Sequence, residues 1–475
     1  MALLWCAAVA GGAPLLPASP PAHPLAVSGD SYLDARASVA APALLDALRR
    51  IHRAVPGFSR QTGLPCSTCH YQFPQLTPFG RLFKLNGYTM SGLATIAGGD
   101  SSRPSLKLPP IPTVSTMVVA SLAHTSKVLP EAQNNTTLFP EQASVFLGGE
   151  ITPRMGAFVQ FTYAAPDGAI GIDNVDVRYA NHTSWFDKDL LLGATLHNNP
   201  TVQDVWNTVP AWTFPFMSAS VMPSPIASTL VDGTLGQQVL GLGGYALWDN
   251  LLYAEFTAYR SAQQGTAAPL DSGSQSVISN FIPYGRVALQ NAFGDTYLMV
   301  GGFGFLGARV YPKGVTGPTD RYTTLGADAQ MEHKLNAGGA MLIGRTSYIH
   351  EAQTLDATFA AAEAQNPTAD VETFRVNVSY LPNVHWSGTL GWFSTMGSSD
   401  VVRYPAEDFI GSRTGKPNTD GAIAELTWNA WENTRLGLQY TAFTRFNGAG
   451  DAYDVAGGRR AADNNTLYLY TWLAF

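Results

Sequence analysis

Apolar and polar residues alternate strictly in many segments between residue 111 and residue 475. Examples are 325–332 (LGADAQME), 374–380 (FRVNVSY) and 436–443 (LGLQYTAF). Successive side chains of a β-strand point to opposite faces of the sheet, so this pattern gives each strand one apolar face and one polar face. A soluble β-sandwich also alternates in this way, and the pattern alone therefore predicts strands but not their assembly.

The alternating segments predict about sixteen strands, an even number within the range of bacterial outer-membrane barrels. The expected strands cover residues 111–123, 143–151, 155–164, 169–180, 189–198, 236–248, 251–262, 280–292, 295–310, 321–333, 339–352, 371–381, 385–397, 420–430, 434–446 and 465–475.

The connections between these strands alternate in length. Tight turns are expected at 153–154, 249–250, 294–295, 382–383 and 432–433, and long loops at 124–142, 199–235, 263–279, 353–370, 398–418 and 447–464. Outer-membrane barrels have short periplasmic turns and long external loops, whereas a sandwich has no reason for this order. Two connections deviate, because 165–168 is short and 181–188 is longer than a tight turn. We expect a mainly β fold, an antiparallel outer-membrane β-barrel over residues 105–475 with membrane lipid around it.

Composition agrees with a barrel that has a lipid-facing surface. Charged residues make up only 13% of the chain, and aromatic residues make up 11%. No segment approaches the roughly eighteen consecutive apolar residues of a transmembrane helix, so strands would have to cross the membrane. The net charge of −7 argues against nucleic acid as a partner and is compatible with a cationic one.

Residues 1–104 have a different pattern. We expect an export signal and a flexible leader over 1–42, although no Lys or Arg precedes the apolar run Ala2–Ala10. From Ala43 apolar residues recur at helical spacing until Pro56. Thr77 as N-cap, followed by Pro78, predicts a second short helix that ends before Gly87. Residues 43–104 therefore predict a small helical domain in front of the barrel.

The sequence Cys66-Ser-Thr-Cys69-His70 is the attachment pattern for a c-type haem. Two thiols three positions apart reach the two vinyl groups of one haem, and His70 is aimed at the iron as the proximal axial ligand. A structural zinc site needs four ligands, but Cys6 would leave with the signal and no second cysteine pair remains. A thioredoxin-like redox pair would need an α/β context, which is missing. We expect one covalent haem c and assign no catalytic residue beyond it.

The second axial position is open at this point. Met90 follows the second helix and is the candidate distal ligand, His52 is its rival, and a five-coordinate iron is the third alternative. Aromatic residues that would pack around the porphyrin are Phe73, Phe79 and Phe83, and cations that would pair with its propionates are Arg60, Arg81 and Lys84. Each of these is also compatible with an ordinary core or surface position.

The run PGFSRQTGLPCSTCH at 56–70, with FGR at 79–81 and GYTM at 87–90, resembles the fused outer-membrane cytochrome–porins of iron-oxidising bacteria. NNPTVQDVWN at 198–207, PAW at 210–212 and FNG at 446–448 extend the resemblance over nearly the whole chain. The resemblance implies that the cytochrome domain accepts electrons from extracellular Fe(II). It also implies a periplasmic c-type cytochrome or another soluble carrier as the electron acceptor.

A haem below the barrel would be too far from an external donor, because the apolar band of such a barrel is about 25 Å tall. We therefore expect residues 43–95 to plug the lumen and to raise the haem toward the outer face. The protein is expected in the bacterial outer membrane, with the haem domain inside the barrel or on its periplasmic side. The loop 199–235 either folds inward and lines the constriction or packs outside. No iron-binding residue is assigned, since carboxylates on expected external loops (Asp204, Glu131 and Glu141) are ordinarily solvated. The alternatives are a porin-type channel with a tethered haem sensor or gate, and electron transfer with a donor other than iron, including transfer outward.

Overall fold

The computed structural model describes residues 56–90, 114–128, 135–164, 168–261, 277–312, 317–456 and 458–475. The expected leader, the helix expected before Pro56, His52 and Glu131 lie outside the described residues. Among the described residues, no helix combines the length and the apolar character that crossing a bilayer requires.

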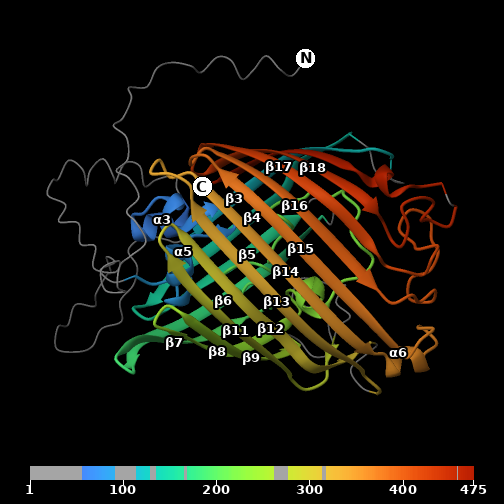
Figure 1. Cartoon of the computed structure of the whole chain (residues 1–475), viewed down its shortest axis with the longest axis horizontal. Coiled ribbons are helices and arrows are strands. Elements are labelled where there is room, and N and C mark those ends of the chain that lie inside the picture. Colours follow the sequence, from blue (N-terminus) through green and yellow to red (C-terminus); the bar gives the residue numbers. More distant parts are fainter. Residues whose placement is uncertain are drawn as a thin grey trace, which may run out of the picture.

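One antiparallel sheet makes up most of the described chain (Figure 1). Its strands are β3 (Val114–Thr125), β4 (Asn135–Thr152), β5 (Met155–Ala164), β6 (Ala169–Trp185), β7 (Lys188–His197), β8 (Val239–Trp248), β9 (Leu252–Ser261), β10 (Val277–Ile278), β11 (Ile282–Phe293), β12 (Thr296–Tyr311), β13 (Asp320–Lys334), β14 (Met341–Thr354), β15 (Thr368–Leu381), β16 (Trp386–Gly397), β17 (Thr419–Trp431), β18 (Thr434–Arg445) and β19 (Thr466–Ala474). The two-residue strand β10 pairs with β12, and the other strands form the wall.

The sheet closes on itself. Each long strand pairs with its neighbours in the sequence, β9 pairs with β11, and β19 pairs with β3. Without β10, the sheet of 17 strands is a closed barrel of 16. Closure leaves no unpaired edge, which is what a sheet needs in order to cross a membrane. The expected sixteen-stranded antiparallel barrel is confirmed.

The long turn expected at 181–188 is wrong. Strand β6 continues to Trp185 and β7 begins at Lys188, so only Phe186 and Asp187 form the turn. Both residues have positive φ, 52° and 57°, as a two-residue type I′ hairpin requires. The polar stretch before Trp185 concealed the strand, because its residues are exposed and break the alternation on which the prediction depended.

The two faces of the wall differ as the alternation predicts. On β18, Leu436, Leu438 and Tyr440 face outward and are 37%, 46% and 44% exposed. Gln439 and Thr441, which face the lumen, are each 1% exposed. Apolar side chains therefore cover the outside, and polar side chains are packed inside.

Two ends of the barrel can be distinguished. The tight-turn end carries the connections 153–154, 186–187, 249–251, 294–295, 335–340, 382–385 and 432–433, and the long-loop end carries the others. In outer-membrane barrels the short turns face the periplasm. Figure 1 shows the described N-terminal helices and the C-terminus at one end, and α6 (Asp356–Ala360) at the other.

Residues 56–90 form a small unit inside the tight-turn end, which we call the plug. It contains α3 (Gly57–Thr62), α4 (Cys66–Cys69), β1 (His70–Gln72), β2 (Gln75–Leu76) and α5 (Pro78–Leu85). The expected second helix is α5, and Thr77 caps it by accepting a hydrogen bond from the Gly80 backbone N–H to Oγ1 at 3.1 Å. A small helical unit therefore precedes the barrel, and its exact boundaries at 43 and 104 lie outside the described residues.

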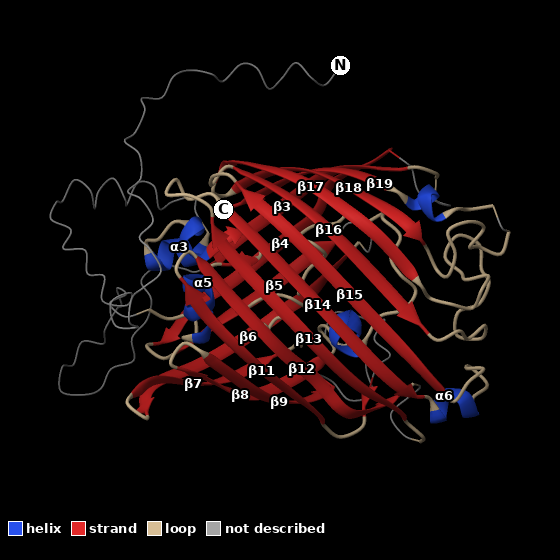
Figure 2. Ribbon diagram, in the orientation of Figure 1, coloured by secondary structure: helices blue, strands red, loops and turns tan. Residues whose placement is uncertain are grey.

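A second segment, which connects β7 to β8 in the sequence, lies inside the lumen. Residues 198–238, which we call the inserted loop, contain a single helical turn, η1 (Leu230–Thr234). Figure 2 shows this turn inside the ring of strands, away from both rims. Of the two alternatives for this loop, the structure has the inward one.

Candidate functional site

The two cysteines of the Cys-x-x-Cys-His motif begin and end α4, a single helical turn. Both thiols are free of disulfide bonds and half-buried. Burial raises the pKa of Cys66 and, as the largest cause, raises the pKa of Cys69 to about 12. Ser59 Oγ lies 3.5 Å from the Cys66 Sγ. The helical turn thus carries two free thiols three positions apart, the spacing of a c-type haem attachment motif.

His70 follows α4 in an extended conformation, and its ring packs against Phe73 with the ring centroids 4.2 Å apart. Phe73 in turn packs against Trp472 of β19 at 4.8 Å. Nδ1 of His70 is buried and has no hydrogen-bond partner in the described part of the chain. Burial, and then the positive charge of Arg435, lower the pKa of His70 to about 4. The imidazole is therefore neutral, which is the state that binds a metal.

The barrel wall holds the motif at the tight-turn end. Glu432, in the turn between β17 and β18, accepts hydrogen bonds from the Cys66 backbone N–H at 2.6 Å and from Ser67 Oγ at 2.8 Å. Arg435, at the start of β18, donates from Nη1 to the Phe73 carbonyl oxygen at 3.1 Å. The expectation that the plug raises the motif toward the outer face is therefore wrong, because these turn residues bind it at the opposite end.

Three cations that we considered for haem propionates bind the barrel instead. Arg81 pairs with Glu332 at 2.5 Å, and both side chains are at most 4% exposed. Lys84 lies 3.9 Å from Asp176 and donates to the Val202 carbonyl oxygen. Arg60 donates to the Val114 carbonyl oxygen. The cation that lies beside His70 is Arg435, which sequence reasoning missed because it is far away in the chain.

Met90 ends the described part of the plug and is half-buried. Its segment is connected to the motif through α3, since Gln61 Nε2 donates to the Tyr88 carbonyl oxygen at 3.4 Å and Ser59 contacts Cys66. Its role as the distal ligand stays a prediction.

The aromatic residues of the plug separate into two groups. Phe83 is buried and packs edge-on against Phe58 at 5.4 Å, while the Tyr88 ring stacks on Phe58 at 5.5 Å. Phe79 is half-buried. Only Phe73 directly contacts the His70 ring.

The residues of the motif fit a c-type haem. The two thiols are unpaired, the histidine is neutral with a buried ring nitrogen lacking a partner, and aromatic rings lie beside it. No group of three or more His, Cys, Asp or Glu side chains that could hold a metal ion occurs in the described ranges. Cys66, Cys69 and His70 therefore do not form a zinc site among the described residues.

The inserted loop is anchored to the lumen by hydrogen bonds. Trp206 Nε1 donates to Tyr297 Oη at 2.8 Å. Asp204 accepts from the Trp206 backbone N–H at 3.0 Å and lies 3.6 Å from Arg286 of β11. Asp204 is therefore buried inside the barrel and is not a solvated residue of an external loop.

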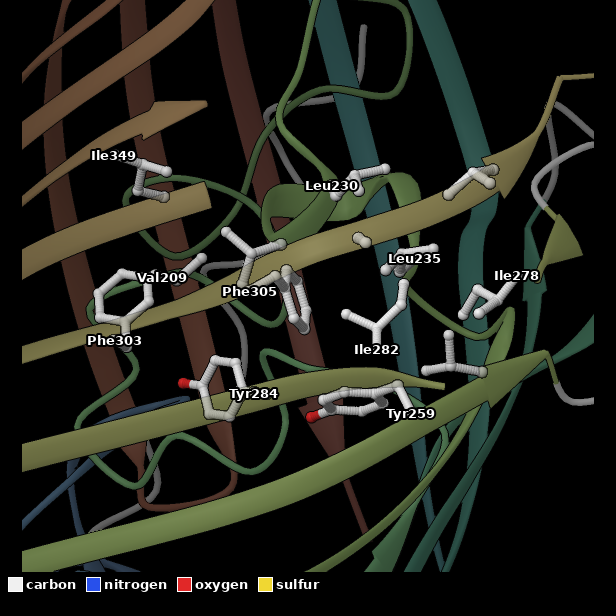
Figure 3. Packing of buried hydrophobic residues seen from close by; sticks show 14 residues of the cluster. Val209, Leu230, Leu235, Tyr259, Ile278, Ile282, Tyr284, Phe303, Phe305 and Ile349 are labelled. Carbon is white, nitrogen blue, oxygen red and sulfur yellow. The ribbon is translucent and has the colours of Figure 1, made fainter. Parts of the chain in front are cut away.

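Apolar side chains of the same loop pack against the wall (Figure 3). Val209, Leu230 and Leu235 belong to a buried cluster that includes Tyr259 and Phe305 from the strands. Leu235 and Phe305 are completely buried. Apolar packing against the strands thus holds the loop inside the barrel.

The expectation for Glu141 is wrong as well. It lies within β4 and is 6% exposed, where it accepts hydrogen bonds from Tyr468 Oη at 2.5 Å and from the Ser220 backbone N–H at 2.9 Å. The pairing of β3 with β4 is irregular here, since Val119 faces Gln142 and Ser121 faces Leu138. The extra residues 139–141 of β4 interrupt the alternation, and the sequence pattern therefore missed this part of the strand. Glu141 therefore ties the inserted loop to the wall.

The closed ring of sixteen strands with an apolar outside defines the chain as an outer-membrane β-barrel of the porin type. Among solved structures, it is similar to OmpF of Salmonella typhi in complex with daunomycin (10% identity, 76% of this chain and 97% of the other covered, TM-score 0.43). It is also similar to the anion-selective porin of Comamonas acidovorans (12% identity, 76% and 99% covered, TM-score 0.42). These scores are low, so the class rests on the strand order and the surface of the chain itself.

No protein-family model matches the chain, and no curated protein matches it. The outer membrane follows from the barrel, while the chemistry of the plug has to be argued from its residues.

Proposed function

We propose that this protein is an outer-membrane electron-transfer protein, an Fe(II)-oxidising cytochrome fused to a barrel. Cys66 and Cys69 would hold one c-type haem through thioether bonds, and His70 would be its axial ligand. The observation that carries the proposal is the Cys-x-x-Cys-His turn with a neutral histidine, bound inside a barrel wall by Glu432 and Arg435. The haem, when bound, supplies a one-electron redox centre.

The residues around the motif would fix its position for electron transfer to the periplasm. The tight-turn end faces the periplasm in barrels of this kind, and Ser67 at this end is exposed. A soluble carrier such as a c-type cytochrome could therefore approach the motif directly. The neutral imidazole of His70 keeps its nitrogen available for a metal without having to lose a proton first.

The donor side is constrained by the inserted loop. An external donor approaches from the long-loop end, and the membrane band between the two ends is about 25 Å tall. Residues 198–238 fill the lumen between that end and the plug. Fe(II) would therefore have to enter the long-loop mouth and move inward along the inserted loop, because a donor that stays at the mouth is too far from a haem at the tight-turn end.

The proposal is tested with purified full-length protein in proteoliposomes that contain a soluble cytochrome c. First, a haem assay should give one covalent haem per chain, and the Cys66→Ser variant should lose the two-thioether attachment. Then Fe(II) added outside to the oxidised protein should reduce the haem and afterwards the enclosed cytochrome. Absence of covalent haem would refute the cofactor, and absence of reduction by Fe(II) would refute iron as the donor.

A porin-type channel with a haem sensor or gate is the competing function, and it is equally compatible with the barrel. Conductance across a planar bilayer distinguishes the two. A lumen filled by the plug and the inserted loop should pass little current, whereas a channel should show conductance steps that change with the redox state of the haem.

A further inference from the structure

Three arginines lie in one row across the outer face of the barrel wall, on strands that are close neighbours in the sheet (Figure 1). They are Arg260 of β9, Arg309 of β12 and Arg321 of β13, and all three side chains are exposed. The residue before each arginine is at most 1% exposed. Because successive side chains of a strand point to opposite faces, the three guanidinium groups point away from the lumen. We call these residues the arginine row.

The pairing of the strands places the three arginines at the same height. Arg309 and Arg321 are directly opposite each other in the register of β12 and β13. Strand β10 takes the place of β11 at this level: Ile278 pairs with β12 beside Arg309, and its backbone N–H donates to Oγ of Ser261, beside Arg260, at 2.7 Å. Arg260 and Arg321 are therefore three strand spacings apart, about 14 Å at about 4.8 Å for each spacing.

The arginine row carries positive charge without a carboxylate beside it. In the described part of the chain, neither Arg309 nor Arg321 lies at ion-pairing distance from a carboxylate. The exposed carboxylates of β15, Asp370 and Glu372, lie 3.7 Å and 3.4 Å from His350 instead. Like charges directly opposite each other destabilise a sheet, so this pair of arginines indicates an anion that is supplied from outside the chain.

The position of the row on the wall indicates where that anion comes from. The row lies near the long-loop end, which is the external end of an outer-membrane barrel. On the side toward the middle of the barrel, Leu306 of β12 and Leu325 of β13 are 63% and 54% exposed. The row is therefore at the outer boundary of the apolar band, the level at which lipid headgroups lie.

The charges at the opposite end are arranged differently. At the tight-turn end Lys188 pairs with Asp249 at 2.9 Å, and His182 lies 3.3 Å from Asp189. Exposed charges of both signs are thus mixed at that end, whereas the arginine row contains only cations.

We propose that the arginine row binds the phosphate groups of a phosphorylated glycolipid of the outer leaflet, of the lipid A type. Guanidinium groups match the oxygen pairs of phosphate, and Arg309 with Arg321 can hold one phosphate together. The guanidinium of Arg260 lies 5.6 Å from the ring of Phe281, which is 60% exposed, and is placed for a second phosphate on the same disaccharide. The acyl chains would lie against the apolar band below the row. The site is independent of the haem, because all of its residues lie on the outer face of the barrel.

The test uses purified full-length protein in a nonionic detergent at constant ionic strength. Native mass spectrometry counts the lipid molecules that stay bound while diphosphoryl lipid A is titrated. We expect one saturable site, with weaker binding of monophosphoryl lipid A and of phosphatidylglycerol. Inorganic phosphate should not displace the lipid, because it lacks the acyl chains that contact the apolar band.

Arg321→Glu is the decisive variant. It converts the like-charged pair with Arg309 into a pair of opposite charge, so the barrel should keep its heat-modifiable shift in gel mobility. Its affinity for lipid A should fall about tenfold or more, since a charge-assisted contact with phosphate is lost and a repulsive one is added. Arg154→Glu makes the same change of charge at an exposed turn of the opposite end and should bind lipid A as the wild type does.

Four results would overturn the proposal. They are the absence of saturable lipid A binding by the wild type, equal binding of monophosphoryl lipid A or phosphatidylglycerol, displacement of the lipid by inorganic phosphate, and a folded Arg321→Glu variant that binds no more weakly than Arg154→Glu.

Discussion

The ion pair between Arg81 of the plug and Glu332 of β13 should decide how firmly the plug is docked. Glu332 accepts hydrogen bonds from Arg81 Nη1 at 2.5 Å, from Tyr71 Oη at 2.8 Å and from Gln330 Nε2 at 2.6 Å. The change Glu332→Gln keeps the size of the side chain but removes the charge. Arg81, which is 3% exposed, is then left as a buried cation without its carboxylate.

The expected cost is large because both partners are inaccessible to water. Breaking a buried ion pair by removing one partner costs about 3–5 kcal/mol. At about 1.4 kcal/mol for each factor of ten, a loss of 3 kcal/mol in docking free energy increases the open population of the plug roughly a hundredfold. Replacing both partners by Met should recover most of this loss, since no uncompensated charge remains.

Amide hydrogen exchange of α5, followed by mass spectrometry, measures this opening directly. In Glu332→Gln the amides of 78–85 should exchange roughly a hundred times faster than in the wild type, while those of β14 should be unchanged. The control is Glu372→Gln, which removes a carboxylate that is 34% exposed and 3.4 Å from His350. Such a surface pair contributes little, and exchange of α5 should stay at the wild-type rate.

Two results would refute this reasoning. Unchanged exchange of α5 in Glu332→Gln would mean that the ion pair does not hold the plug. The second result concerns the double variant Arg81→Met with Glu332→Met. If α5 exchanges as fast in this variant as in Glu332→Gln, the packing or hydrogen bonding of Glu332 holds the plug, and the unpaired charge is not the cause of opening.

Three further predictions concern the wall, the motif and the loop. Gly193→Val should impair barrel assembly, because an added Cβ would lie 2.0 Å from the ring of Tyr245. Assembly is measured as the heat-modifiable shift in gel mobility. The control is Gly244→Ala, whose Cβ meets nothing closer than 3.7 Å. Arg435→Gln should lower the haem reduction potential in a redox titration. A unit positive charge about 10 Å from the iron favours the reduced state by roughly 1.7 kcal/mol at a dielectric constant of about 20. An unchanged or higher potential would contradict this electrostatic role. Replacing 210–222 by a short Gly-Ser linker should raise single-channel conductance several-fold, and an unchanged conductance would show that the plug alone seals the pore.

Local pattern was sufficient to predict the wall of the barrel. The side-chain period of two and the order of short and long connections are properties of neighbouring residues, and they predicted all sixteen strands. The errors lie where a bulge or a polar strand end interrupts the alternation, as in β4 and at the end of β6. The capped helix α5 was predicted for the same reason, because Thr77, Pro78 and Gly87 act within a few residues.

The candidate site was predictable only as a set of neighbouring residues. Cys66, Cys69 and His70 are recognisable because haem attachment depends on their spacing in the sequence. Glu432 and Arg435, which bind this motif, are far from it in the sequence. Cys66 and Glu432, for example, are 366 positions apart. Nothing in the sequence around either residue indicates that contact.

The sequence by itself determined the strands and the capped helix, and it placed Cys66, Cys69 and His70 next to one another, because each of these depends on residues close together in the chain. Only the tertiary structure decided that the motif lies at the tight-turn end, that the loop after β7 turns inward, and that Arg81 pairs with Glu332 across 251 positions. Those decisions depend on closing the ring, which brings charges that are distant in the sequence together in the barrel interior, where a buried charge without a partner is costly.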